Sequence, residues 1–385
     1  MAHHNTLFHQ MLNFIPRHQF QALERTHSTG RKSRSFSRWN QFVHLAFMQL
    51  TGRVSLRDGI RSMNSRSKCL YHLGANPVPR ATFSDANNKR PASFYEALFG
   101  KAYQRCCLIA PKHKFKFKNR LYSLDASVID LSLKAFPWAS FRRTKSAVKL
   151  HTLLDHSGYL PAFVSITDGK THETKVARSL RLPKGSIVVE DRAYTDYRWF
   201  ASLQENGIFF VTRQKSNAVY RVIERRYVNR KQGLTSDQTI QLTGAKGAQC
   251  PHRLRRIGYR DPETGRHYVF LTNHFKLAAK TIADIYKERW QIEIFFRWIK
   301  QNLKIKAFIG NSRNAVMTQL YVALIAYLLL CLFKWLSKIS ASLQNVLRIL
   351  QINLFRKCSL KELFEPPPDK MDKPIDDRQL LLAFP

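Results

Sequence analysis

The spacing of hydrophobic and polar positions changes along the chain and divides it into four regions. The first, residues 1 to about 105, has helical spacing, clearest in "FSRWNQFVHLAFMQL". Gly52 is a plausible helix stop, and Ser55 with Asp58 resembles a capping box for a following helix. Two short helices around a glycine turn are typical of helix-turn-helix DNA binders. The alternative is an ordinary helical domain with a solvated basic face.

The second region, residues 118 to 211, has the short periods of strands. "RLYSLDASVIDLSL" alternates apolar and polar residues, and "AVKLHTLLDHSGYLPAFVSITD" predicts two strands joined at Ser157-Gly158. "GSIVVEDRAYTDYRWFASL" predicts a buried strand at 186–189, a loop and a helix, and "GIFFVTR" predicts another strand. Three antiparallel strands followed by strand–helix–strand indicate an α/β fold.

The third region, residues 212 to about 275, carries short alternating runs and turn signals, which predict a β-rich insertion. The fourth opens on the helix-length segment "YKERWQIEIFFRWIK" and continues into the apolar run 320–333. That run is shorter than the ~20 residues of a membrane span, so we expect a fully buried helix, with a transmembrane helix as the alternative. The proline-rich stretch after Leu363 predicts an exposed tail.

Charge points to a polyanionic partner. The chain has 385 residues and a formal net charge of +38, from 64 Lys+Arg against 26 Asp+Glu. Nucleic acid is the first candidate partner, and an anionic membrane surface is the alternative. The six cysteines show no CxxC spacing, so neither a structural zinc site nor a disulfide framework is expected, and a reducing cytoplasm fits. The N-terminus lacks the pattern of a signal peptide.

The segment "YKERWQIEIFFRWIK" places one acid in a row of bases. Its stripe residues are spaced by 3, 4, 4 and 3 positions and share one helix face: Tyr286, Arg289, Glu293, Arg297 and Lys300. An adjacent face is apolar: Ile285, Ile292, Phe295, Phe296 and Ile299. The ordinary interpretation is a surface Glu293 in i,i+4 pairs with Arg289 and Arg297, worth a few tenths of a kcal/mol.

Two further carboxylates favour a functional role for Glu293 over the ordinary interpretation. Asp125 sits inside the predicted strand "YSLDAS", and Asp191 follows the buried strand "SIVVE". Such a carboxylate is costly unless it is paired or bound to a metal, although each could simply cap a turn. The competing acids are Asp130, Asp155, Asp168 and Glu190, whereas Asp196 is expected to cap the following helix.

Convergence of Asp125, Asp191 and Glu293 would create a site for hard cations. Mg²⁺ prefers oxygen ligands and shares them with substrate phosphates. Two such ions stabilise the attacking and leaving oxygens of a phosphoryl displacement. In that site Arg289 and Lys300 would hold phosphate, and Tyr286 would donate a hydrogen bond to the DNA backbone.

With these residues in view, the chain resembles bacterial insertion-sequence transposases of the DDE superfamily, in the branch marked by Y-x2-R-x3-E-x6-K. The signature matches Tyr286, Arg289, Glu293 and Lys300. "LDAS" matches the segment around the family's first aspartate and "DRAYTD" the segment around the second. "FVTRQKSN" and "LTN" also look like family segments, and the first hundred residues resemble an N-terminal domain of one subset.

The resemblance implies a ribonuclease-H-like core with a β-rich insertion before the catalytic helix. It implies two Mg²⁺ ions, for which Mn²⁺ can substitute, cleavage at transposon ends and transfer of the 3′-hydroxyl into target DNA. The expected partners are double-stranded DNA, as terminal inverted repeats and target, and a second copy of the chain in a synaptic homodimer. No membrane partner is expected, and the expected location is the bacterial cytoplasm, with the nucleoid.

Some relatives cut the second strand through a hairpin and stack a flipped base on an insertion tryptophan. The insertion here has no tryptophan. The tyrosines that could stack instead are Tyr220, Tyr227, Tyr259 and Tyr268.

The resulting hypothesis is an α/β protein with three parts. Residues 1–105 form a helical, basic DNA-binding domain, 118–336 a ribonuclease-H-like catalytic domain with its insertion at 212–275, and 337–385 a helical segment and proline-rich tail. The predicted catalytic and metal residues are Asp125, Asp191 and Glu293. The predicted DNA-binding residues are Tyr286, Arg289, Arg297, Lys300, Arg192, Arg213 and Lys215. The alternatives to a cut-and-paste transposase are a nuclease without strand transfer and an inactive DNA-binding relative.

Overall fold

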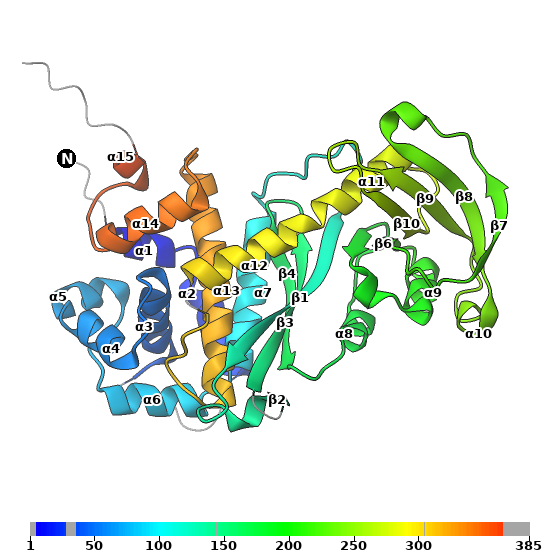
Figure 1. The fold of residues 1–385 in the computed structure, drawn as a ribbon. Helices are drawn as coiled ribbons and strands as arrows, with labels where there is room; N and C mark the ends of the chain where they lie inside the picture. Colours follow the sequence, from blue (N-terminus) through cyan, green and yellow to red (C-terminus); the bar gives the residue numbers. More distant parts are fainter. Residues whose placement is uncertain (1–4, 28–35, 143–144, 304, 365–385) are drawn as a thin grey trace, which may run out of the picture.

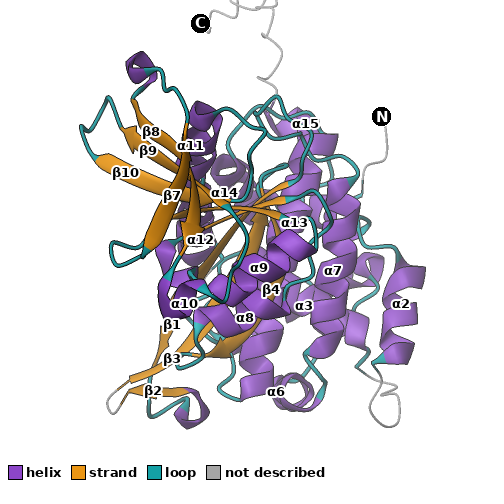
Figure 2. Cartoon of the chain, turned by 90° about the vertical axis from the view of Figure 1, so that its right-hand side faces the viewer, coloured by secondary structure: helices purple, strands orange, loops and turns teal. Residues whose placement is uncertain are grey.

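The structure, a computed structural model, describes residues 5–27, 36–142, 145–303 and 305–364. It is a mixed α/β fold in which helices from both ends of the chain gather beside one long, twisted sheet (Figure 1, Figure 2). The proline-rich tail predicted after Leu363 lies almost entirely outside the described residues.

The N-terminal part is helical. Its elements are α1 (Leu7–Leu12), α2 (Arg17–Thr26), α3 (Arg38–Leu50), α4 (Leu56–Asn64), α5 (Ser67–Leu70), η1 (Tyr71–Leu73), α6 (Arg80–Lys89) and α7 (Ser93–Cys107). The Ser37 side chain caps α3 by accepting from the Asn40 N–H at 3.0 Å. Gly52 ends this helix region with φ +67°, as the sequence suggested. The predicted capping box is wrong: the Ser55 side chain makes no cap hydrogen bond, and the Asp58 carboxylate pairs with Arg53 instead of reaching back to Ser55.

One ten-stranded sheet forms the rest of the framework. Its strands are β1 (Leu121–Leu131), β2 (Ser140–Arg142), β3 (Lys145–Asp155), β4 (Leu160–Asp168), β5 (Ile187–Glu190), β6 (Phe209–Arg213), β7 (Tyr220–Arg225), β8 (Leu234–Leu242), β9 (Leu254–Arg260) and β10 (His267–Thr272). β1 and β4 each pair antiparallel with β3, whereas β1, β5 and β6 are parallel to one another in that order. This arrangement confirms the ribonuclease-H-like α/β fold class.

The insertion strands extend the main sheet. β10 pairs antiparallel with β6, and β9, β8 and β7 follow outward, so they form the far end of the ribbon in Figure 1. A buried ion pair joins β8 to β9 at this end of the sheet. Arg255 Nη2 donates to Asp237 Oδ2 at 2.7 Å, and both side chains are only 6% exposed. Arg255 Nη1 also donates to the carbonyls of Phe275 and Leu277, so a further nitrogen of the buried guanidinium has partners.

The later helices cover the sheet and close the core. They are α8 (Glu173–Ser179), η3 (Arg192–Tyr194), α9 (Tyr197–Glu205), α10 (Gly244–Gly247), α11 (Ala279–Glu288), α12 (Trp290–Asn302), α13 (Arg313–Leu336), α14 (Leu343–Asn353) and α15 (Leu360–Phe364), with the short helices η2 (Pro137–Ala139) and η4 (Arg230–Gln232).

Helix α13 contains the apolar run found in the sequence. It is long and apolar enough to cross a membrane, yet 94% of its apolar window is buried inside the protein. It packs against α3 and α7 and shares one hydrophobic cluster with the N-terminal helices and with β1, β3 and β4. The helix therefore has the environment of a core helix, as expected.

Candidate functional site

The signature segment forms two helices. α11 ends at Glu288 and α12 begins at Trp290, with Arg289 as the junction. The backbone bonds there are short-range: the Arg289 N–H donates to the Tyr286 carbonyl, and the Ile292 N–H donates to the Arg289 carbonyl, both at 3.1 Å. The single continuous helix assumed from the sequence is therefore interrupted by a tightened i→i+3 turn.

The apolar face of this segment is buried as predicted. Ile285 packs beneath the sheet end, while Ile292, Phe295, Phe296 and Ile299 are each at most 5% exposed in the main core. Burial of this face turns the other side of α12, with Glu293, toward β1. The amphipathic pattern thus orients the acid, because only one rotation of α12 buries its four apolar side chains.

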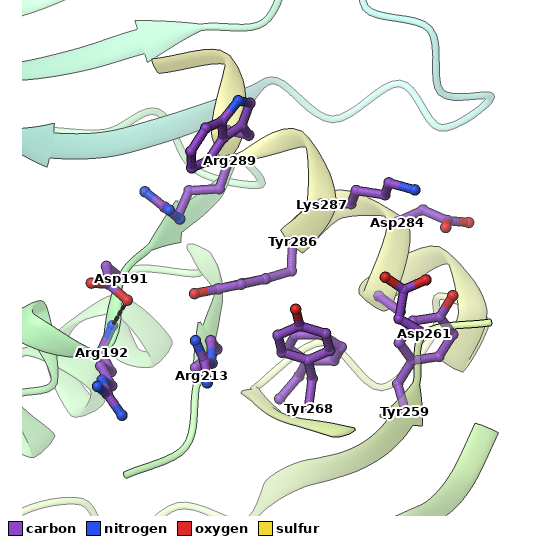
Figure 3. Close-up of a pocket in the computed structure, with 13 residues that line it drawn as sticks. Asp191, Arg192, Arg213, Tyr259, Asp261, Tyr268, Asp284, Tyr286, Lys287 and Arg289 are labelled. Carbon is purple, nitrogen blue, oxygen red and sulfur yellow. Dashed lines mark hydrogen bonds between the residues drawn. The ribbon is translucent and has the colours of Figure 1, made fainter. Parts of the chain in front are cut away.

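Two parallel strands bring the aspartates together. β1 and β5 pair in register through Leu124 and Glu190, and the next residues in the sequence are Asp125, inside β1, and Asp191, directly after β5. Adjacent strands lie ~4.8 Å apart, and in-register residues of parallel strands project to the same side. Asp191 also caps η3, its Oδ1 accepting from the Arg192 N–H at 2.7 Å (Figure 3).

Arg289 joins the first aspartate to the helix glutamate. Its Nη1 donates to Asp125 Oδ2 at 3.3 Å, and its Nη2 donates to Glu293 Oε1 at 2.6 Å. The Arg289 side chain is only 14% exposed, so the ion pair is shielded from water. The i,i+4 pair of the ordinary interpretation, Arg289 with Glu293, is thus present. The same arginine also binds Asp125, an acid of a distant strand.

Burial makes the Asp125 carboxylate costly. It raises the pKa of Asp125 to about 6; the Ala126 N–H and Arg289 oppose the rise, while Glu293 and Asp191 add to it. All three acids are therefore close enough to influence one titration. Burial thus makes the charged form of Asp125 more costly than in an exposed aspartate, and a nearby cation lowers that cost.

The oxygen donors suit a hard cation, although their present spacing is not that of a metal cage. Within the described ranges, no three His, Cys, Asp or Glu side chains are grouped closely enough to hold a metal ion. Arg289 supplies the positive charge between Asp125 and Glu293. Three carboxylates, one of them destabilised by burial, match the ligand chemistry of Mg²⁺.

An aromatic cavity of about 440 Å³ adjoins the acids on the insertion side (Figure 3). Its lining is Asp191, Arg192, Arg213, Tyr259, Asp261, Tyr268, Phe270, Ala283, Asp284, Tyr286, Lys287, Arg289 and Trp290. The Tyr286 ring extends across it, and the Arg213 guanidinium lies 5.1 Å from the centre of the Tyr268 ring. Burial raises the pKa of Tyr286 to about 12, so its hydroxyl is a hydrogen-bond donor at neutral pH.

Only two of the four candidate stacking tyrosines line this cavity. Tyr259 and Tyr268 do, whereas Tyr227 is 95% exposed and Tyr220 lies under the Arg256 guanidinium, 5.2 Å from it. Phe270 and Trp290 also line the cavity but were not selected from the sequence. Trp290, in the signature segment, is 50% exposed. Its position as a large apolar residue on a polar helix face was the feature of the sequence that could have identified it.

The predicted basic residues divide by environment. Lys300 Nζ donates to the Val128 carbonyl at 2.9 Å, which holds it on β1, three residues along the strand from Asp125. Arg192 and Lys215 line an open groove that starts at Asp191. Arg297 is exposed on α12.

One acid of the signature segment has a structural role that its position did not reveal. Glu288 is buried and accepts from Lys114 Nζ at 2.5 Å and from the Tyr159 hydroxyl at 3.4 Å. These contacts anchor the helix junction next to Arg289. Of the competing acids, Glu190 is fully buried, and burial raises its pKa well above its usual value. Asp196 caps α9 as expected.

Comparison with known proteins shows that this α/β protein belongs to a class of enzymes that act on DNA. The family model described as "Transposase DDE domain" matches residues 116–329, and a "Domain of unknown function" matches residues 3–76. The chain belongs to the DDE transposase family, which confirms the resemblance found in the sequence.

Individual relatives carry matching names. The chain is 32% identical to "Putative transposase y4zB" of Sinorhizobium fredii, over 74% of this chain and 80% of that one. It is 32% identical to "Probable transposase for insertion sequence element IS5377" of Geobacillus stearothermophilus, over 67% and 68%. A piggyBac transposase synaptic complex with hairpin DNA has a TM-score of 0.46 and 11% identity, covering 94% of this chain and 81% of that chain, too weak a likeness to carry an argument.

Proposed function

We propose that this protein is a cut-and-paste transposase. It would bind the ends of an insertion sequence, hydrolyse the phosphodiester bonds there and join the 3′-hydroxyl ends to target DNA. The observation that carries the proposal is the approach of Asp125, in β1, to Asp191, directly after the adjacent strand β5, with Glu293 joined to Asp125 through Arg289.

In this proposal Asp125, Asp191 and Glu293 hold two Mg²⁺ ions, or Mn²⁺ in their place. When bound, the ions supply Lewis-acid stabilisation to the attacking and leaving oxygens. The three carboxylates must first be ionised, and Asp125 and Glu293 must be freed from Arg289. Arg289 would then turn from Asp125 to a DNA phosphate, so one guanidinium balances the acids in the free protein and grips substrate in the complex.

The remaining predicted residues would position DNA. Lys300, Arg297, Arg192, Arg213 and Lys215 would neutralise phosphates around the acids, and the Tyr286 hydroxyl would donate to a backbone oxygen. The aromatic cavity offers a place for an unstacked base, with Tyr259 and Tyr268 as stacking surfaces.

The proposed assembly is a homodimer that holds two transposon ends, with residues 1–105 as a DNA-binding domain. A dimer is the smallest symmetric assembly that can bring two ends together for joining. The proposed location is the cytoplasm, at the nucleoid.

The test uses purified protein, labelled end sequences, supercoiled plasmid and Mg²⁺. Joined products support transposition, cleavage alone supports a nuclease, and a mobility shift without cleavage supports an inactive binder. Replacing Asp125, Asp191 or Glu293 with alanine should abolish cleavage and leave binding of the ends largely intact.

The matched control is Asp130→Ala. Asp130 is an exposed acid of the same strand β1, and cleavage by this variant should persist. A triad variant that still cuts in a Mg²⁺-dependent manner would remove that residue from the site.

A further inference from the structure

The two helices of the predicted helix-turn-helix have opposite environments. All 13 residues of α3 are buried, so this helix has no surface left for a partner. The following helix, α4, buries only one side, through Gly59, Ile60 and Met63. If either helix contacts DNA, it must be α4.

Helix α4 is firmly mounted on the domain. A Cβ at Gly59 would lie 2.7 Å from Met48 Cγ, so glycine permits the close packing of α4 on α3. At the other end, the Asn64 side chain exchanges two hydrogen bonds with the Val78 backbone, at 2.9 and 3.1 Å. A helix fixed at both its middle and its end can hold side chains at a defined angle to a partner.

The exposed side of α4 is basic. Arg57 and Arg61 are exposed one turn apart, and neither has a hydrogen-bond or ion-pair partner among the residues that the structure describes. Their neighbours differ: Arg53 pairs with Asp58 at 3.0 Å, and the Arg66 guanidinium covers the Phe355 ring at 4.6 Å. Arg57 and Arg61 are therefore the two α4 cations available to a ligand.

We propose that α4 enters the major groove of double-stranded DNA and that Arg57 and Arg61 contact bases there. The proposal rests on the transposase function and gives the N-terminal domain its task. The major groove admits one α-helix, and an arginine can bind O6 and N7 of guanine with two parallel hydrogen bonds. The second helix of a helix-turn-helix is the one that makes such contacts.

The position of α4 makes its DNA contact separate from the chemistry. α4 lies on the opposite side of the protein from strands β7–β10, and β1 and α12, the elements that carry Asp125 and Glu293, lie between them (Figure 1). A DNA end cut at the acids would therefore meet α4 at a different stretch of its sequence. Sequence recognition and cleavage can then be separated by mutation.

The test compares the full-length protein on two duplexes without divalent ions. One duplex carries about 30 base pairs, roughly three helical turns, from one of the insertion-sequence ends that flank the gene. The other duplex carries the same bases in shuffled order. The measured quantity is the ratio of the two dissociation constants. Mg²⁺-dependent nicking of supercoiled plasmid is measured separately, because it reports on the proposed function.

Three double variants make the test specific. R57Q/R61Q should lower the preference for the end duplex by roughly 5- to 150-fold per lost base contact. R57K/R61K keeps the charge but lacks the bidentate fork, so it should retain binding to shuffled DNA and lose the preference. K101Q/R105Q removes the same charge from exposed positions one turn apart on α7 and should keep the preference.

The outcomes separate the two proposals. An unchanged preference in R57Q/R61Q, with plasmid nicking intact, overturns the role of α4 and leaves the transposase function standing. An equal loss of preference for the end duplex in K101Q/R105Q also overturns the role of α4, because the loss of total positive charge would then explain the effect. Wild-type protein that neither binds nor nicks DNA overturns both the role of α4 and the transposase function. A circular dichroism spectrum of each variant shows whether it is folded.

Discussion

Replacing Asp125 with asparagine should stabilise the folded protein at neutral pH while removing its activity. Burial raises the pKa of this carboxyl to about 6, from an ordinary value of 3.8. Each pKa unit corresponds to 1.36 kcal/mol, so ionised Asp125 costs the folded state about 3 kcal/mol. Asparagine has nearly the same shape and carries no charge, so it avoids this cost.

The sign of the pH dependence follows from the raised pKa. Below pH 3.8 Asp125 is protonated in both folded and unfolded chains, and the two proteins should have equal stability. The wild type then loses stability as the pH rises through 6. The expected advantage of the variant is about 1 kcal/mol at pH 4.5 and about 3 kcal/mol at pH 7.5.

Thermal unfolding at these two pH values measures the effect. For a chain of this length the advantage corresponds to a rise in melting temperature of roughly 1 °C at pH 4.5 and roughly 4 °C at pH 7.5. Added Mg²⁺ should stabilise the wild type and leave the variant unaffected, because binding to the folded state alone raises stability.

Asp130→Asn is the control for this experiment, since Asp130 is exposed on the same strand. It should produce no pH-dependent shift. A variant at Asp125 that is destabilised at pH 7.5, or equally shifted at both pH values, would refute the reasoning. The Arg289 ion pair would then outweigh the cost of burial.

Three other predictions concern binding and stability. Lys300→Ala should weaken binding to the ends and reduce the salt-dependence slope by about one, and an unchanged slope in a salt titration would argue against phosphate contact. Arg255→Ala should cost about 3 kcal/mol in urea unfolding, because it leaves the buried Asp237 with Arg226, at 3.3 Å, as its remaining ion-pair partner; a loss below about 1 kcal/mol would contradict this. Ser37→Ala should cost about 1 kcal/mol and Ser55→Ala almost nothing, because only Ser37 caps its helix; equal losses would refute the assignment.

Local patterns in the sequence determined the elements of this protein. The helical spacing of "FSRWNQFVHLAFMQL" predicted α3, and the alternation around Asp125 predicted β1. The same reasoning placed Glu293 on a face separate from the apolar face that the structure buries. These predictions succeeded because side-chain period and burial are properties of a few adjacent turns or residues.

The tertiary structure decided how these elements meet. Arg289 lies 164 residues from Asp125 in the chain, and its bond to that acid depends on strand order and helix packing. Joining of the insertion strands to the main sheet placed Tyr259 and Tyr268, and not Tyr227, beside the acids. Burial of all of α3 left α4 as the exposed basic helix. Sequence period specifies which side of an element is apolar, but only packing specifies what that side and its opposite face encounter.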